Sequence, residues 1–447
     1  MSTVTSAAPD VERLKEAAAR AVRELTGTAD YVQVFAESTL AVSVECTDGE
    51  VAATCGDLRE GLGCLVLKDG GWRYRSVTPA QAGGIADWLG APRPATGPVW
   101  ASCPDASGFT PVGPADWQVE GGTVPQSIRS VEDFTYRRYA VADTEGNAYA
   151  GATHILRRRV EASVVVSGRR YRGLSRWLRE GAAAVHAGGP VQDLVHTALG
   201  HARDSAAAAV SGKHRTPVVF GPSAAAGFLH ELVGHALEAD NFLLDSDYIT
   251  ELRRSRTLPP ALTIRDDPAV EHGYGSHPAD DEGLAAAPTT MVENGELGVP
   301  LTSIRTAQRG GYRRTASARR TDFRSPAIPR ASNTVVLPGS DDPNLLVRSS
   351  GGGVLYVGSL GAGMIYLGTG EFTFAGLNCH YLTPAGDRIP ARDVSLVGNA
   401  LRTLARLEGI GSDFGGDNAT CGKQGQLIGI GLYSPSMRYA ALDWSAA

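Results

Sequence analysis

The sequence predicts an α+β protein with two domains, and three observations support this. The chain has 447 residues, more than a single compact core usually contains. Apolar and polar residues alternate over long stretches in both halves, which is typical of strands, whereas helical periodicity is confined to a few short segments. We therefore expect an N-terminal helix-plus-sheet domain over residues 1–212 and a strand-rich C-terminal domain over residues 213–447, which carries one helix rich in potential metal ligands.

The N-terminal domain is expected to open with an amphipathic helix over residues 9–26, where five apolar side chains recur at helical spacing: Val11, Leu14, Ala18, Val22 and Leu25. Strands are expected from Tyr31 to about Ser76, and Asp48-Gly49 within them predicts a hairpin turn. A short helix near residues 79–90 and a connection rich in Pro and Gly, reaching to about residue 125, are expected next.

Further strands are expected from Phe134 to about Tyr171, around a turn at Glu145-Gly146-Asn147. A helix from about Pro190 to Val210 follows them. The basic cluster Arg157-Arg158-Arg159 precedes an apolar stretch, and we interpret it as an exposed edge or turn rather than as a binding surface.

In the C-terminal domain, Pro217 to Phe220 predicts a short buried strand, and Gly221-Pro222-Ser223 predicts a turn into a helix that runs from Ala224 to Asp240. The remainder is predicted to be rich in strands, with a hairpin turn at Glu293-Asn294-Gly295-Glu296. Apolar and small residues alternate from Gly353 to Gly376. Because no G-x-G-x-x-G motif lies there between a strand and a helix, these glycines indicate bulges and closely packed strands rather than a phosphate loop.

Composition excludes several classes of function. The formal net charge is −6 and the basic residues are scattered, so that no nucleic-acid-binding surface is expected. No run of 18 or more apolar residues exists, which argues against a membrane span, and the N-terminus lacks the pattern of a secretory signal. The cysteines form no CxxC pair, as expected of free thiols or ligands in a reducing compartment, and we therefore expect a cytoplasmic protein.

Residues His230 to His235, with the sequence HELVGH, place two imidazoles and a carboxylate within about a turn and a half of helix. Zinc hydrolases use such a set, because neutral imidazoles hold the metal and a free carboxylate takes a proton from the metal-bound water. The histidines are five residues apart instead of four, and side chains at this spacing diverge by roughly 140° on a regular α-helix. Both can reach one metal only if the helix widens into a π-bulge or ends there, and Gly234 is the residue expected to permit either distortion. The alternative is a helix with two unrelated histidines.

A catalytic zinc usually has three protein ligands, so a third residue must come from elsewhere in the chain. Cys421 is our candidate, since it lies beside glycines in the segment from Asp417 to Gln426, where a thiolate on a tight turn could approach a metal closely. Spacing alone does not decide between this cysteine and four chemically equivalent choices: Cys379, His380, His272 and His277.

These motifs resemble those of the TldD/PmbA family of metallopeptidases, specifically its TldD-like catalytic branch. The family's H-E-x-x-x-H-x-L-E helix matches His230 to Glu238, and its C-G-K-x-G-Q segment matches Cys421 to Gln426. Further matches follow the family's order and cover most of the chain: Val44-Glu45, Asp48-Gly49, Gly61-Leu62-Gly63, Asp280-Asp281-Glu282-Gly283, Arg319-Arg320, Pro329, Arg330 and Asn333. The chain departs from the family pattern in an arginine-rich stretch after Asp240, which puts the range of substrates in doubt.

The resemblance implies one zinc ion per chain, held by His230, His235 and Cys421, with Glu231 as the general base. It also implies a partner subunit, either of the zinc-less PmbA-like type in a heterodimer or a second copy in a homodimer. Family members bind extended peptide as an added strand at an exposed sheet edge, in a chamber that dimerisation closes. The expected substrates are unfolded or small peptides, including ribosomal precursors with leader segments.

Six further residues are candidates for supporting the metal or binding the substrate: Glu238, Asp280, Asp281, Arg319, Arg320 and Arg330. Glu238 follows His235 by three residues and could orient its imidazole, or it could be a solvated carboxylate on the helix surface. The two aspartates could support the site or cap a turn. The three arginines could anchor a peptide carboxylate or form structural ion pairs.

The function that the sequence predicts is zinc-dependent amide hydrolysis, in which Glu231 accepts a proton from the water and later delivers it to the leaving amine. This could be housekeeping proteolysis or a maturation or tailoring step in a bacterial natural-product pathway. Two alternative functions belong to other functional classes than peptidases. One is a metal-dependent enzyme that cleaves an amide or C–N bond of a small biosynthetic intermediate. The other is a non-catalytic scaffold that stabilises a peptidase partner, and the complete set of ligands argues against it.

Overall fold

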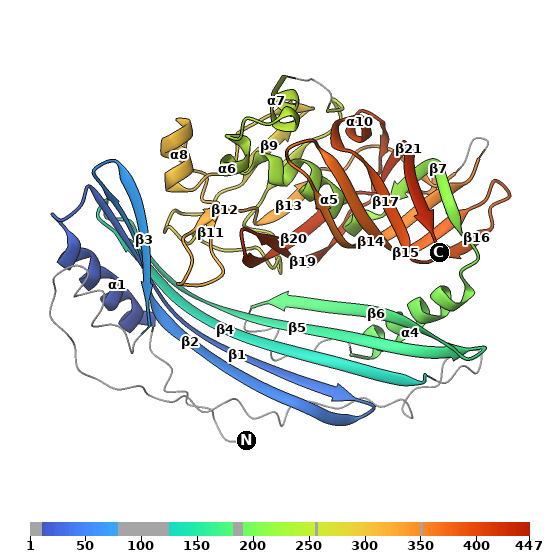
Figure 1. The fold of residues 1–447 in the computed structure, drawn as a ribbon, viewed down its shortest axis with the longest axis horizontal. Coiled ribbons are helices and arrows are strands. Elements are labelled where there is room, and N and C mark those ends of the chain that lie inside the picture. Colours follow the sequence, from blue (N-terminus) through green and yellow to red (C-terminus); the bar gives the residue numbers. More distant parts are fainter. Residues whose placement is uncertain (1–10, 79–124, 182–190, 255–257, 349–351) are drawn as a thin grey trace.

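The computed structural model describes residues 11–78, 125–181, 191–254, 258–348 and 352–447. It confirms the α+β class: a long curved sheet from the first part of the chain lies beside a second part, in which short helices pack among further sheets (Figure 1). The helix predicted near residues 79–90, most of the connection to residue 125 and Cys103 lie outside the described residues.

The first part of the chain is built on one antiparallel sheet of six strands in the order β3-β2-β1-β4-β5-β6. Its strands are β1 (Tyr31–Thr47), β2 (Glu50–Lys68), β3 (Gly71–Val77), β4 (Ser127–Asp143), β5 (Ala148–Val166) and β6 (Arg169–Glu180). Two helices accompany the sheet, α1 (Val11–Leu25) and α4 (Val191–Ala207), close to the ranges predicted for them.

Both helices cover the same face of this sheet. Helix α1 packs against a cluster that includes Ala140 of β4, and α4 packs against a cluster that includes Ile128 of the same strand. Residues of a strand that are separated by an even number of positions point to the same side, and these two are twelve apart. The opposite face of the sheet is therefore left to the second part of the chain, which contacts it through Phe323 against Phe35 and Tyr139.

The three predicted turns are confirmed, and each has the backbone that its residues favour. Asp48 (φ 53°) and Gly49 (φ 90°) join β1 to β2, as expected of a two-residue hairpin with both central residues left-handed. Asn294 (φ 51°) and Gly295 (φ 80°) do the same between β9 (Thr289–Glu293) and β10 (Glu296–Leu297). Gly146, with φ 89°, lies in the turn between β4 and β5.

The second part of the chain contains two larger sheets. In one, strands β7 (Gly212–Phe220), β14 (Val354–Ile365), β15 (Glu371–Leu382), β17 (Val394–Asn399) and β21 (Met437–Ala446) form a closed ring, because β14 pairs with both β7 and β15. β16 (Arg388–Ala391) and β18 (Leu407–Ile410) extend this sheet. The other sheet has the order β10-β9-β8-β13-β20-β19 and consists of β8 (Ile264–Asp266), β9 (Thr289–Glu293), β10 (Glu296–Leu297), β13 (Asn333–Val336), β19 (Gly415–Lys423) and β20 (Gln426–Ser434).

Smaller elements connect these sheets. They are α5 (Pro222–Leu229), α6 (Ala239–Phe242), α7 (Asp247–Arg254), α8 (Ile304–Gly310), β11 (Ala318–Arg319), β12 (Ile328–Pro329), α9 (Pro343–Leu346) and α10 (Ala400–Leu404). Helix α5 lies between the ring and the other sheet, and its residues from Ala224 to Leu229 are all buried. Phe228 on this helix packs among four aromatic rings, with centroid distances of 4.6 to 5.6 Å, from Phe220, Phe372, Phe374 and Tyr439. A helix enclosed on all sides needs small and apolar residues throughout, and α5 has them.

Two sequence predictions about individual segments are wrong. The cluster Arg157-Arg158-Arg159 is neither an edge nor a turn, because it lies inside β5, which pairs with β4 on one side and β6 on the other. The helix predicted from Ala224 to Asp240 is not continuous, since Glu238 has an extended backbone. The division of the chain at residue 213 stays a prediction. Among the described residues, no helix is long and apolar enough to cross a membrane.

Replacing Gly173 by alanine should destabilise the first sheet, because a Cβ at this position of β6 would lie 1.9 Å from the carbonyl oxygen of Ala198 and 2.4 Å from the amide nitrogen of Ala202. Helix α4 would have to move away from the sheet, at a cost of roughly 1–3 kcal/mol in the free energy of unfolding. Urea denaturation monitored by circular dichroism measures this change.

Gly200→Ala is the matched control, since Gly200 lies on α4 and a Cβ added there would meet no atom within 4 Å. This substitution should stabilise the protein by about 0.4–1 kcal/mol, because alanine restricts the unfolded chain more than glycine does. Equal denaturation midpoints for the two variants would contradict the close packing of α4 on β6.

Candidate metal centre

The segment with the two histidines is a helix that changes its pitch. Helix α5 ends at Leu229, residues His230–Gly234 form a π-helical turn, and His235–Leu237 form a 3₁₀ turn before Glu238 becomes extended. The amide of His235 donates to the carbonyl oxygen of His230, five residues earlier. This is the local widening that the five-residue spacing predicts, and it brings the two imidazole centroids to within 4.7 Å.

Gly234 does not provide the backbone freedom that we expected of it. Its φ and ψ are both −55°, a conformation open to any residue. A Cβ at this position would instead lie 3.4 Å from Nδ1 of His230. An added Cβ would thus meet the imidazole at about van der Waals contact, so that neither the backbone nor the surrounding space requires glycine here.

Cys421 on β19 completes the group. Its Sγ lies 3.3 Å from Nε2 of His230 and 3.2 Å from Nε2 of His235, and all three side chains are buried. Oε1 of Glu231 lies 3.8 Å from the same nitrogen of His235. The ligand atoms of these four residues lie within 4.8 Å of one another, a grouping that could hold a metal ion.

Glu238 supports His235 and is fully buried, which excludes the alternative of a solvated surface carboxylate. Its Oε2 lies 2.8 Å from Nδ1 of His235 and accepts a hydrogen bond of 2.9 Å from Nζ of Lys423. Lys423 also donates to Asp240 at 2.6 Å. Burial raises the pKa of Glu238, but the charges of Lys423 and His235 outweigh this and hold the pKa well below its usual range.

Arg330 holds the β-hairpin that carries Cys421. It is completely buried, and its guanidinium donates to the carbonyl oxygens of Cys421 at 2.7 Å and Gln426 at 3.2 Å. Its Nε lies 3.8 Å from Oε1 of Glu238. This side chain therefore joins the hairpin between β19 and β20 to the carboxylate that supports His235.

Two supporting residues were not predicted from the sequence. The hydroxyl of Thr334 on β13 lies 3.0 Å from Nδ1 of His230. Glu238 contacts the same ring nitrogen, Nδ1, of His235. Lys423 belongs to the C-G-K-x-G-Q segment, a match that assigns it no role. A threonine on a buried strand has no local signal that could have indicated contact with a residue 104 positions away.

The site has the charge pattern of a thiolate beside imidazolium. Burial raises the pKa of the Cys421 thiol, but the charge of His230 and hydrogen bonds from both imidazoles lower it to about 4. Burial lowers the pKa of His235, but the charge of Glu238 and hydrogen bonds with Cys421 and Glu238 raise it well above its ordinary value. A cation that binds both side chains would displace the proton from the imidazole.

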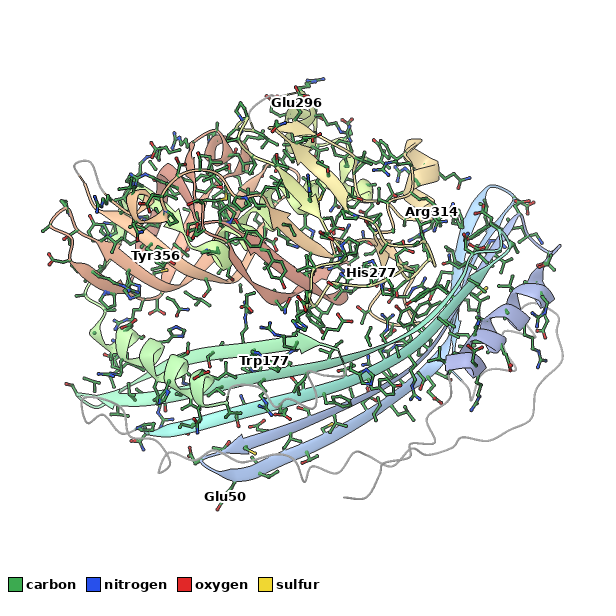
Figure 2. All side chains as sticks on the ribbon, turned by 180° about the vertical axis from the view of Figure 1, so that it is seen from behind. Glu50, Trp177, His277, Glu296, Arg314 and Tyr356 are labelled. Carbon is green, nitrogen blue, oxygen red and sulfur yellow. The ribbon has the colours of Figure 1, made fainter. Side chains whose placement is uncertain are left out.

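Glu231 faces a cavity of about 840 Å³ that also contains His230, His235 and Cys421 in its lining. The cavity lies between the two parts of the chain. The first sheet contributes residues of β5 and β6, and Trp177 in Figure 2 marks this side. The second part of the chain contributes residues of β14 and β15 and of the strands around Cys421. Burial raises the pKa of the Glu231 carboxyl above its ordinary value, which makes its carboxylate a stronger base.

The four other residues considered as a third ligand lie elsewhere. Cys379 and His380 are on β15, where His380 contacts Asp204 at 3.2 Å and Arg388 at 3.1 Å. His277 lies 2.8 Å from the carbonyl oxygen of Gly275 and lines a second cavity, and His272 is exposed. Among the described residues, none of these four joins the group around Cys421.

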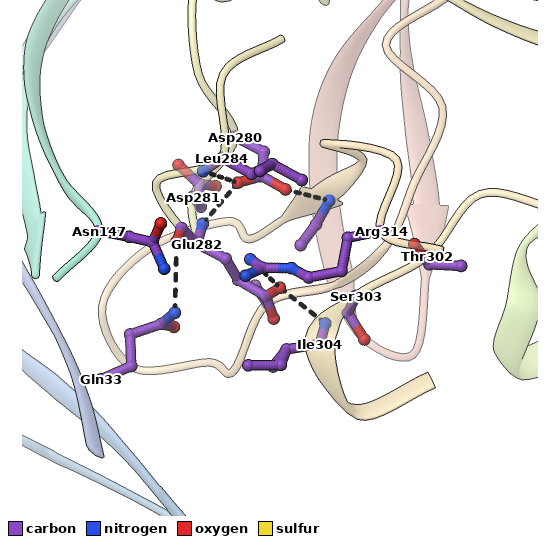
Figure 3. Close-up of polar contacts among 12 residues, drawn as sticks. Gln33, Asn147, Asp280, Asp281, Glu282, Leu284, Thr302, Ser303, Ile304 and Arg314 are labelled. Carbon is purple, nitrogen blue, oxygen red and sulfur yellow. Dashed lines mark hydrogen bonds and ion pairs between the residues drawn. The ribbon is translucent and has the colours of Figure 1, made fainter. Parts of the chain in front are cut away.

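Asp280 and Asp281 lie in a tight loop beside the first sheet, not in the group around Cys421. Figure 3 shows Asp280 accepting hydrogen bonds from the amides of Glu282 and Leu284. The neighbouring Glu282 is fully buried, accepts from the amide of Ile304 at 2.7 Å and pairs with Arg314 at 3.2 Å. Gln33 of β1 donates to its carbonyl oxygen, so this loop joins the two parts of the chain.

Arg319 and Arg320 line the second cavity, which has a volume of about 260 Å³. Arg319 donates to the carbonyl oxygens of Ala331 and Gly429, both at 2.8 Å. Arg320 donates to the carbonyl oxygen of Asp281 at 3.0 Å and lies over the ring of Phe35. Neither they nor Arg330 are among the residues that line the cavity with Glu231.

Comparison with known proteins identifies the class. Residues 213–444, more than half of the chain, match the family model described as the PmbA/TldA metallopeptidase C-terminal domain, and the chain therefore belongs to the PmbA/TldA metallopeptidase family. It is 37% identical over 225 residues to a metalloprotease of Methanothermobacter thermautotrophicus, covering 50% of this chain and 49% of that protein. It is 31% identical over 227 residues to the zinc metalloprotease TldD homolog of Saccharolobus solfataricus, covering 51% of this chain and 50% of that protein.

The matches with these curated relatives span about half of their length. Solved structures match almost the whole fold. TldE from Thermococcus kodakarensis has a TM-score of 0.71 at 13% identity, covering 96% of this chain and 99% of that one. A structure from Bacteroides thetaiotaomicron described as a putative modulator of DNA gyrase has a TM-score of 0.71 at 15% identity, covering 98% and 99%. At this level of identity, the likeness concerns the fold alone.

Glu238→Gln should lower the affinity of the group around Cys421 for added zinc without removing any of its four candidate ligands. The amide can still accept a hydrogen bond from His235, but it no longer stabilises charge on the imidazole and leaves Lys423 with one carboxylate. Loss of such support typically costs about 10–100-fold in metal affinity. Competition with a chromophoric chelator measures the affinity.

Asp240→Asn is the matched control, because Asp240 also pairs with Lys423 but does not contact His235. We expect its zinc affinity to stay close to that of the wild type. If both variants lost affinity equally, the effect would belong to Lys423 and not to the orientation of His235.

Proposed function

We propose that the chain is a zinc-dependent peptidase of the HExxxH type, which hydrolyses amide bonds of unfolded or small peptides in the cavity beside Glu231. The observation that carries the proposal is the convergence of His230 and His235 with Cys421, which lies 191 and 186 residues away from them, beside a carboxylate that faces the same cavity. The zinc metalloprotease name of the Saccharolobus solfataricus relative supports the choice of metal.

The donor set fits zinc. Two imidazole nitrogens and one thiolate are ligands that zinc prefers, and three protein ligands leave a fourth position open for catalysis. Tetrahedral zinc, with bonds of about 2.0 Å to nitrogen and about 2.3 Å to sulfur, separates these atoms by roughly 3.5 Å. The structure has 3.2 and 3.3 Å, so small outward shifts of the side chains would suffice.

His230, His235 and Cys421 would hold the metal. A zinc ion bound there lowers the pKa of a coordinated water and polarises the carbonyl group of the substrate. Thr334 and Glu238 hold the Nδ1 sides of the two imidazoles, which keeps both Nε2 atoms directed at Sγ of Cys421. Glu231, on the cavity side, accepts the proton of the attacking water on its carboxylate and then donates it to the nitrogen of the leaving amine.

The substrate is proposed to bind as an extended strand. β19 is the last strand of its sheet among the described residues, and it contributes Ala419 to Lys423 to the wall of the cavity. An edge strand offers unpaired backbone groups to a peptide.

We further propose that the protein is a cytoplasmic enzyme that works with a second family subunit or with a second copy of this chain. Its role would be housekeeping proteolysis or the maturation of a bacterial natural product.

Removal of the metal should abolish peptidase activity, and zinc should restore it.

Cys421→Ala should bind less than about a tenth of the zinc of the wild type, since two imidazoles alone hold zinc weakly. Atomic absorption on purified protein measures zinc per chain, with one expected for the wild type. Cys55→Ser is the control, because Cys55 is exposed on the first sheet. Full zinc content in Cys421→Ala would contradict the proposed ligand set.

Glu231→Gln should keep its zinc and lose activity by about 10²–10⁴-fold, the usual contribution of a general base. Zinc content and kcat/KM on a fluorogenic peptide are measured on the same preparation. Activity at the wild-type level would exclude this carboxylate as the proton acceptor. A chain that binds zinc stoichiometrically but cleaves no peptide, alone or with a partner, would favour a metal-dependent reaction on a smaller substrate.

A further inference from the structure

The wall of the cavity that faces the metal centre is basic. β5 contributes Arg157 and Arg159 to it, and β6 contributes Arg176. Arg159 and Arg176 lie directly opposite each other in the pairing of β5 with β6, and Arg157 is two positions along the same face. Among the described residues that line the cavity, Glu231 is the sole carboxylate. The sheet wall thus concentrates positive charge in a partly enclosed space.

Two of the three arginines already have partners. Arg157 donates to the hydroxyl of Tyr274 at 3.3 Å and lies 4.0 Å from Asp133. Arg176 pairs with Asp417 at 3.2 Å. These contacts fix the two guanidinium groups at the edge of the cavity but leave other N–H donors of each group unused, since a guanidinium carries five.

Arg159 is exposed and forms no hydrogen bond and no ion pair within 4.0 Å of a described residue. Two carboxylates on its face are paired with other arginines: Glu161 with Arg172 at 3.4 Å, and Glu45 with Arg129 at 2.6 Å. The pKa of Glu45 is lowered mainly by the hydrogen bond from Arg129, and the charge of Arg159 adds to this effect. Like charges directly opposite each other on neighbouring strands destabilise a sheet. An anion bound between Arg159 and Arg176 would therefore reduce the repulsion between these two side chains.

We propose that the substrate of this cavity carries a carboxylate, which Arg159 binds together with Arg157 and Arg176 while the scissile bond lies at the metal centre. The proposal rests on the proposed function, because it assumes that the cavity is the place of cleavage. The planar fork of arginine matches a carboxylate and binds it with two parallel hydrogen bonds. The carboxylate could belong to an acidic side chain or to the C-terminus of a peptide, and the two sources can be distinguished.

The test uses four N-acetylated hexapeptides as probes: AAEFAA and AAQFAA, each with a free or an amidated C-terminus. Their affinities are measured by isothermal titration calorimetry with the full chain after zinc removal by a chelator. Without zinc, a carboxylate cannot bind through the metal, and no peptide is cleaved during the titration. The same series is repeated with zinc-loaded Glu231→Gln.

The expected result is binding at least about tenfold tighter for a peptide with a carboxylate than for its uncharged counterpart, the effect of one hydrogen-bonded charge pair. A preference for glutamate over glutamine identifies an acidic side chain, and a preference for the free over the amidated terminus identifies the α-carboxylate. The preference should disappear in Arg159→Gln, weaken in Arg159→Lys and fall as salt concentration rises.

Arg170→Gln is the matched control, because Arg170 lies on the same face of β6, carries the same charge, does not line the cavity and leaves the pair of Glu161 and Arg172 intact. It should keep the full preference. The proposal is overturned if the neutral amidated peptide binds as well as the others, if Arg159→Gln and Arg170→Gln behave alike, or if no acidic peptide binds at millimolar concentration. Peptide binding with this preference but without hydrolysis by the zinc-loaded wild type would refute the proposed function and leave the carboxylate site standing.

Discussion

The carboxylate of Glu238 has no exposed surface, and a buried charge is tolerated only where opposite charges and hydrogen-bond donors surround it. Its partners come from three segments: His235 three residues earlier in the chain, Lys423 at the end of β19, and Arg330 directly after β12. Because His235 and Lys423 share one oxygen atom, the helix with the histidines and the hairpin with Cys421 are fixed relative to each other. The position of the thiol beside both imidazoles follows from this ionic network as well as from apolar packing.

The cavity exists because the two faces of the first sheet are used differently. Helices α1 and α4 bury one face, so that the other remains available to the second part of the chain. The loop around Glu282 and the contact of Phe323 with Phe35 fix the two parts together. The candidate metal centre and an apolar wall from β14 and β15 then face the arginines of β5 and β6 across the cavity. The proposed chemistry and the proposed recognition of a carboxylate thus come from different parts of the chain.

Local signals in the sequence predicted much of this fold. Left-handed turn residues at Asp48-Gly49 and Asn294-Gly295 identified hairpins, and the spacing of His230 and His235 predicted a widened helix, which the π-helical turn confirms. The continuous helix to Asp240 was wrong, because Glu238 leaves the helical conformation to reach its partners, and helix propensity does not report such distant contacts. The prediction for Arg157-Arg158-Arg159 was wrong for a related reason. Three consecutive charged residues are typical of an exposed turn, but side chains alternate between the two faces of β5. Arg157 and Arg159 therefore line a cavity that forms only when the second part of the chain packs beside the sheet.

The sequence by itself determined the α+β class, the hairpins and the set of residues capable of zinc chemistry, because these depend on backbone preferences and on side-chain types at short spacing. Only the tertiary structure decided which distant side chains meet. The family resemblance already implied Cys421, but spacing left Cys379, His380, His272 and His277 open, and the structure brings Cys421 beside the histidines. It also gives Thr334 contact with His230, and it uses Arg330 to hold the hairpin instead of lining the cavity. These contacts join residues about 90 to 190 positions apart, and such pairs are selected by the packing of whole sheets, which no local pattern in one chain encodes.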